Sequence, residues 1–167
     1  MAAAIARGVL FVHSAPSSLC RHLERTISAT LGHTVSLVWE EQPVLQGTFR
    51  AELSWRGPRG AGSVLAGALR GWEHVRFEVT EEASPGFDGA RFMHTPDLGV
   101  FYGAMDSAGN TVVTEDRLKA ALEQGRGDFR VIEKELRLAW GAAWDDELEP
   151  FRYAGEDTGL IWFHQVG

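Results

Sequence analysis

Residues 8–14 read GVLFVHS, a run that is apolar on both of the faces that alternate along an extended chain. Strands of this kind are typical of the middle of a sheet whose two faces are both covered. The run therefore predicts a central strand. The flanking segments must then supply its neighbouring strands and its covering helices.

The segments that follow this run alternate between helical and extended periods. Leucine and isoleucine recur every four residues between Leu19 and Leu31, as on the buried face of a helix. Residues 34–40 and 48–56 alternate apolar and polar side chains, which predicts two half-buried strands.

A second helix and a further strand complete the first half of the chain. The apolar residues between Leu65 and Trp72 have helical spacing, and those between Val75 and Val79 alternate with polar residues. The resulting order, β-α-β-β-α-β, is that of a ferredoxin-like sheet. The sequence therefore predicts an α+β fold whose first half, residues 8–82, is ferredoxin-like.

The second half, residues 87–167, is expected to add a β-meander, two helices and a final strand that pack on the first half. The strand-like runs of the meander are residues 91–95, 98–105 and 111–113. Thr114 is a suitable N-cap for the first helix, and Asp128 for a longer helix whose apolar stripe extends to Leu148. The closing run TGLIWFHQVG is expected to be a strand. No repeat or linker divides the chain, so residues 1–167 are expected to form a single domain.

Composition disfavours several classes of partner and cofactor. A net charge of −7 disfavours nucleic acid, because affinity for it comes mainly from phosphate neutralisation by lysine and arginine. No stretch approaches the roughly eighteen apolar residues of a membrane span. The single cysteine, Cys20, and an N-terminus interrupted by Arg7 indicate a cytoplasmic setting. The six histidines lack metal-ligand spacing, and the glycine-rich GPRGAG lacks a nucleotide-binding pattern, so neither a metal nor a cofactor is expected.

The turn after the first strand offers a candidate site for a small anionic ligand. Ser14, Ser17 and Ser18 lie between the end of that strand and the start of a helix, where free N–H groups attract anions. The alternative is that these serines only cap the helix.

A rival hypothesis is a small hydrolase or transferase, with His13, His94 and Asp97 as its candidate catalytic residues. His94 and Asp97 belong to HTPDLG, a turn between strands, and loop residues often carry function. The alternative for Asp97 is an aspartate satisfied within its own turn. His13 and Ser14 are neighbours on a strand and point to opposite faces, which disfavours a catalytic Ser–His pair.

The segment WDDELEPFRYAGED, residues 144–157, is the main candidate for a contact with another protein. Its candidate partner-binding residues are Asp145, Asp146, Glu147, Glu149, Arg152 and Tyr153. Arginine and tyrosine are frequent interface anchors, and the acids would steer a basic partner. The alternative is a solvated acidic helix face on which Arg152 pairs locally. Pro150 is expected to end the helix at Glu149.

The chain also resembles a family of small actinobacterial proteins known only as a domain of unknown function. The resemblance rests on the segments RGVLFVHSAP, LRGWEHVRFEVTEEASPGFDG, HTPDLGVF, EDRLKAAL and WDDELEPFRYAG. It implies an actinobacterial, cytoplasmic, stand-alone protein and lends no catalytic residue. The sequence therefore favours a non-catalytic binding or regulatory module that acts through protein contacts or a small anionic ligand, with the enzyme hypothesis as the alternative.

Overall fold

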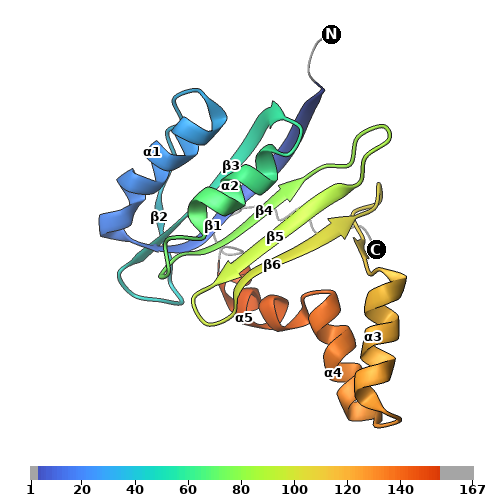
Figure 1. Cartoon of the computed structure of the whole chain (residues 1–167). Coiled ribbons are helices and arrows are strands. Elements are labelled where there is room, and N and C mark those ends of the chain that lie inside the picture. Colours follow the sequence, from blue (N-terminus) through green and yellow to red (C-terminus); the bar gives the residue numbers. More distant parts are fainter. Residues whose placement is uncertain (1–3, 155–167) are drawn as a thin grey trace.

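The computed structural model describes residues 4–154 of the 167-residue chain. These residues form a seven-stranded antiparallel sheet and five α-helices (Figure 1), which confirms the predicted α+β class. The strands are β1 (Ile5–Pro16), β2 (Glu40–Glu41), β3 (Thr48–Pro58), β4 (Arg76–Glu81), β5 (Gly89–Thr95), β6 (Gly99–Met105) and β7 (Thr111–Val112). The helices are α1 (Cys20–Leu31), α2 (Ala61–Leu69), α3 (Glu115–Gly125), α4 (Phe129–Ala139) and α5 (Ala142–Tyr153).

Strand β1 lies inside the sheet, whose order is β2-β3-β1-β4-β5-β6-β7. It pairs antiparallel with β3 on one side and with β4 on the other, and the run predicted as a central strand falls within it. A Cβ atom on Gly8 would lie 1.8 Å from the carbonyl oxygen of Thr80 and 2.5 Å from the ring of Trp55. Only glycine therefore permits the close approach of β4 and Trp55 at this point.

Helices α1 and α2 cover one face of the sheet (Figure 1). The core beneath them includes Leu10, Leu23, Ile27, Leu65, Leu69, Phe77 and Val79. The burial of Leu23 and Ile27 confirms the helix predicted from the four-residue spacing, and Gly32 ends it in a left-handed conformation with φ 75°.

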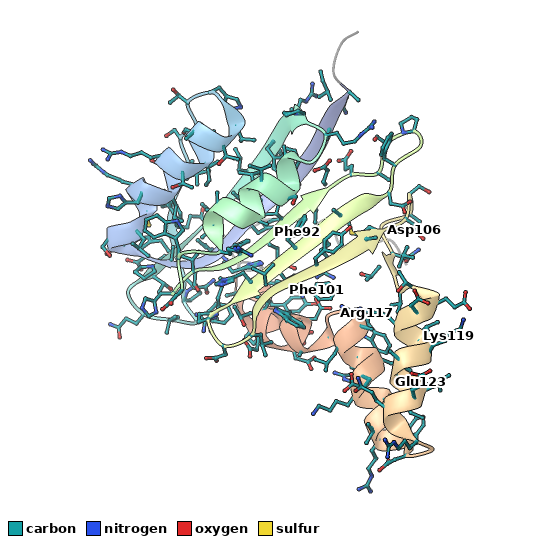
Figure 2. The ribbon with its side chains drawn as sticks, viewed as in Figure 1. Phe92, Phe101, Asp106, Arg117, Lys119 and Glu123 are labelled. Atoms are coloured by element: carbon teal, nitrogen blue, oxygen red, sulfur yellow. The ribbon has the colours of Figure 1, made fainter. Side chains whose placement is uncertain are left out.

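Helix α5 lies against the opposite face of the sheet, over β5 and β6. Leu148 and Trp144 of α5 pack on Met93 and on Phe101, which is labelled in Figure 2. The indole Nε1 of Trp144 donates a hydrogen bond of 3.0 Å to the carbonyl oxygen of Gly99. Helix α5 thus covers this second face only in part: Val9 and Phe11 of β1 are half-buried, and Glu52 of β3 is exposed.

The prediction of a strand over residues 34–40 is wrong for most of that segment, because only Glu40 belongs to β2. Val35 and Leu37 are buried as their alternation indicates. Their backbone N–H groups, however, donate to the side chains of α1, at 2.8 Å to Ser28 Oγ and 2.9 Å to Glu24 Oε1. The helix thus satisfies the backbone that a neighbouring strand would otherwise pair.

The single long helix predicted from Asp128 to Leu148 is two helices, so the described part of the second half contains three helices and not two. The break is at Gly141, whose φ of 84° is left-handed. A Cβ atom there would lie 2.7 Å from Met93 Cε and 2.9 Å from Phe101 Cε1. The apolar stripe gave no sign of this turn, because it continues in phase through Trp140 and Trp144.

The prediction that Pro150 ends the helix is also wrong, since α5 continues to Tyr153. Pro150 is exposed, while Leu148, two residues before it, and Phe151, directly after it, are buried. The anchoring of this last turn to the sheet offsets the local penalty of the proline. The final predicted strand, in the run that begins at Thr158, lies outside the described residues.

Helices α3 and α4 form a hairpin that stands away from the sheet (Figure 1). They pack mainly on each other and, through α4, on α5. Gly125 lies close to Ile132, because a Cβ atom on this glycine would lie 2.2 Å from Ile132 Cγ1. We call residues 115–140, which comprise this hairpin, the arm.

Candidate functional site

Glu78 of β4 lies under α5 and is only 3% exposed. His13 Nε2 lies 2.6 Å from Glu78 Oε2, and the guanidinium groups of Arg91 and Arg152 donate at 3.0 Å and 2.9 Å. Burial raises the pKa of Glu78, but the hydrogen bonds and charges of His13 and Arg152 outweigh it and hold that pKa well below its ordinary value. Glu78 is therefore a buried and ionised carboxylate.

Asp145 of α5 accepts hydrogen bonds from the same two arginines, at 2.7 Å from Arg91 and 2.9 Å from Arg152. Burial lowers the pKa of Arg152, while Glu78 and Asp145 raise it, and the net direction is upward. Two carboxylates and two guanidinium groups thus balance each other between sheet and helix. We call Glu78, Asp145, Arg91, Arg152 and His13 the ion network.

The ion network explains how a carboxylate, Asp145, stands beside the aromatic residues of the segment that begins at Trp144. Trp144 and Phe151 pack toward the sheet, while Asp145 and Arg152 close the ion pairs beside them. A carboxylate held ionised by several cationic donors is a poor proton donor near neutral pH. The geometry of the network therefore favours fixing α5 in place over acid–base catalysis.

Gln42 follows β2 and links the backbone of β1 to that of α5 beside the ion network. No sequence pattern indicated this role. Its side chain is buried, and Nε2 donates to the carbonyl oxygens of His13 at 2.7 Å and Phe151 at 3.5 Å. An isolated glutamine in a polar segment carries no sequence signal for this role.

The proposed anion site does not assemble from its three serines. Ser14 is fully buried, and its hydroxyl accepts a hydrogen bond of 3.3 Å from Arg76. Ser17 and Ser18 are exposed in a 3₁₀ turn, and neither serves as a side-chain cap for α1. Ser14 is thus buried and bonded to Arg76, while the other two serines face solvent.

The three candidate catalytic residues face different surroundings. His13 faces α5 through Glu78, whereas His94 stacks on Phe77, in the core under α1 and α2, with 5.1 Å between ring centroids. His94 Nδ1 lies 2.6 Å from the carbonyl oxygen of Val75, and burial lowers the pKa of this histidine. Asp97 is exposed in the turn between β5 and β6.

The remaining candidate partner-binding residues lie on the outer side of α5. Asp146 is exposed and pairs with Arg137 of α4 at 3.0 Å. Glu149 and Tyr153 are exposed, and Glu147 is half-buried. Asp145 and Arg152, in contrast, have internal partners in the ion network.

A pocket of about 220 Å³ beside β1 and β3 was not anticipated from the sequence. Phe11, Val38, Arg50, Glu40 and Glu52 are among its lining residues. Arg50 pairs with Glu40 at 3.2 Å. With two carboxylates in its wall, the pocket does not favour an anionic ligand.

The arm carries apolar side chains that its own fold leaves uncovered. Phe129 is 72% exposed and Leu122 is 60% exposed, and Leu118 and Trp140 are also exposed. The sequence shows both stripes as the buried faces of helices, and the structure buries only Ala121, Gly125 and Ala139 within the two helices. The apolar stripe of an amphipathic helix is normally buried against another element, so the exposure of these side chains is unusual for a globular protein.

Residues 4–154 show neither a metal cluster nor a membrane helix. Within that range, no group of three or more histidine, cysteine, aspartate or glutamate side chains is arranged to hold a metal ion. None of the helices described is long and apolar enough to cross a bilayer. The buried Cys20 thiol has a pKa raised by burial, which makes it a weak nucleophile.

Comparison with known proteins identifies a family but no characterised relative. A family model described as "Protein of unknown function (DUF3145)" matches residues 9–165. Neither the curated proteins nor the solved structures gave a match.

Proposed function

The chain belongs to the DUF3145 family of proteins of unknown function, and from its own geometry we propose that it is a non-catalytic binding module that acts through contacts with a protein. The arm is its contact surface in this proposal. The observation that carries the proposal is the exposure of Leu122 and Phe129 on two amphipathic helices that stand away from the sheet.

Polar residues on the outer side of α5, exposed except for the half-buried Glu147, supply the polar rim of this surface. Asp146, Glu147, Glu149 and Tyr153 are the rim contacts, and their charge steers a partner that carries basic groups. Asp145 and Arg152 do not contact the partner in this proposal. They fix α5 on the sheet through the ion network, and α5 in turn packs against α4 of the arm. The rival hydrolase or transferase hypothesis has less support, since its candidate residues are engaged elsewhere or face different surroundings.

The proposal also includes the fold type of the first half, the cellular location and the biological origin of the protein. A ferredoxin-like first half is supported by the order β2-β3-β1-β4 and its antiparallel pairing. A cytoplasmic location is supported by the single buried cysteine. An actinobacterial origin is supported by the segments on which the family resemblance rests.

Photo-crosslinking in the native host tests the contact directly. The photoreactive p-benzoylphenylalanine would replace Phe129 in one variant and Leu122 in another, and Arg25 in a control. Arg25 is an exposed residue of α1, on the far side of the sheet from α5. We expect discrete protein adducts from the two arm positions and none from Arg25.

The proposal is overturned if neither arm position gives a discrete adduct. It is also overturned if the Arg25 control gives the same adducts with the same yield, because the capture would then not depend on the arm.

A further inference from the structure

We propose that the protein on the arm is a second copy of this chain, so that two arms pack across a two-fold axis as an antiparallel four-helix bundle. The inference rests on the proposed function, since it names the partner of the same surface. The contacts between the two copies are made by residues 115–140, which form the arm.

The two apolar stripes of the arm adjoin each other. Leu118, Leu122 and Gly125 follow helical spacing on α3, and Phe129, Ile132 and Leu136 follow it on α4. Gly125 contacts Ile132, so the two stripes adjoin where the chain turns from α3 into α4. Lys119 points away from α4 (Figure 2), which places charge on the outer side of α3. Two helices with adjoining apolar stripes are half of a four-helix bundle.

The two helices of the arm differ in the sign of their charge. Helix α3 has three acidic and two basic residues, whereas α4 has three basic and two acidic residues. A two-fold axis that sets α3 of one copy beside α4 of the other therefore pairs an excess of acid with an excess of base. The arm is complementary to itself in charge as well as in apolar pattern.

The size of the arm limits the strength of the dimer. Each helix of the arm has 11 residues. Such a helix is about 16 Å long and about 10 Å wide, so the two side by side span about 320 Å² in projection and, with the relief of their side chains, offer on the order of 500 Å² of accessible surface. This area is at the lower end for specific interfaces and fits a reversible dimer with a dissociation constant in the micromolar range.

Sedimentation equilibrium of the full chain tests the inference, over concentrations from about 1 to 200 µM around the expected dissociation constant. We expect the mass to rise from the chain mass of 18.4 kDa toward twice that value. Leu122→Ser and Phe129→Ser should each raise the dissociation constant at least about tenfold, because each removes an apolar side chain from both copies.

Val64→Ser is the matched control. Val64 is an exposed apolar residue of helix α2, 59% exposed against 60% for Leu122, and it lies outside the arm. It should leave the dissociation constant unchanged, and circular dichroism should show that all three variants stay folded.

A chain that stays monomeric at the highest concentration overturns the second-copy inference. So does a dimer that both arm variants leave intact, because its interface would then lie elsewhere. The proposed function has a separate readout, since crosslinked adducts of a different protein at Phe129 and Leu122 would support it while excluding a second copy. Adducts of twice the chain mass would support both.

Discussion

Glu78 carries a charge at a position where burial alone would keep it protonated. Its ionisation depends on the guanidinium groups of Arg91 in β5 and Arg152 in α5 and on its hydrogen bond with His13 in β1. Removing one member of such a buried group costs more than the pairing contributes, because the others are left uncompensated in a medium of low dielectric constant. The ion network is therefore the most sensitive point of the sheet–α5 contact.

Glu78→Gln should lower the free energy of unfolding by about 3–5 kcal/mol, because it leaves Arg91 and Arg152 facing a neutral amide. The comparison is Asp146→Asn, which breaks the exposed pair with Arg137 and should cost less than about 1 kcal/mol. Urea unfolding followed by circular dichroism measures both. Equal losses in the two variants would contradict the structural role of the network.

The depressed pKa of Glu78 also predicts how stability depends on pH. The unfolded carboxyl has the ordinary pKa of 4.5, and the folded one titrates well below it. The stabilisation is thus fully present above pH 4.5 and is lost as pH falls toward the folded pKa. The free energy of unfolding should decrease as pH is lowered through this acid range. In Glu78→Gln this decrease should be smaller. An unchanged slope in the variant would show that other carboxyls dominate acid unfolding.

At the scale of elements, the break between α4 and α5 decides where the acidic segment lies. A helix that ran straight from Phe129 to Leu148 would carry Asp145 away from the sheet. The left-handed turn at Gly141 redirects the chain and brings α5 onto Met93 and Phe101. The ion network thus depends on one residue without a side chain.

Gly141→Ala should destabilise the protein by about 2–4 kcal/mol, from left-handed strain together with contact of the new methyl group with Met93 and Phe101. Gly127→Ala is the control, because its φ of 87° is similar but no atom lies within 4 Å of the point where a Cβ atom would stand. The control should cost only the backbone strain, about 1–2 kcal/mol. Thermal unfolding of the two variants separates the contact from the strain, and equal losses would refute a close approach at Gly141.

Sequence patterns identified most of these elements because helices and strands have a local period. The run at residues 8–14 and the stripe from Leu19 to Leu31 are examples, and both were confirmed. The turn at Gly141 could not be predicted, since the stripe keeps its phase on both sides of it. The ion network could not be predicted either, because strand register and the path of α5 bring His13, Glu78 and Arg152 together from distant parts of the chain.

For the whole molecule, net charge and apolar surface act in opposite directions on self-association. Two copies with a net charge of −7 each repel at long range. The arm attracts mainly through apolar contact, which salt does not screen, because the charge excess of each of its helices is a single unit and contributes little when exposed. The balance between these two effects therefore depends on ionic strength.

Dimerisation should strengthen when salt is raised from about 20 to 300 mM, because screening removes repulsion on the order of 1–2 kcal/mol, or about tenfold in the dissociation constant. Sedimentation equilibrium at both salt concentrations measures the shift. A dissociation constant that rises with salt would mean that charge pairs, and not the apolar stripes, drive the association.

The short β2 has a consequence for how the protein avoids aggregation. It pairs only with Phe49 and Arg50, so within residues 4–154 the rest of the outer edge of β3 has no neighbouring strand. Such an edge can recruit strands from other molecules into fibrils. The exposed residues along it are Glu52, Ser54, Arg56 and Pro58. Charges and a proline discourage a foreign strand from adding to this edge, so the outer edge of β3 is protected against edge-to-edge pairing between molecules.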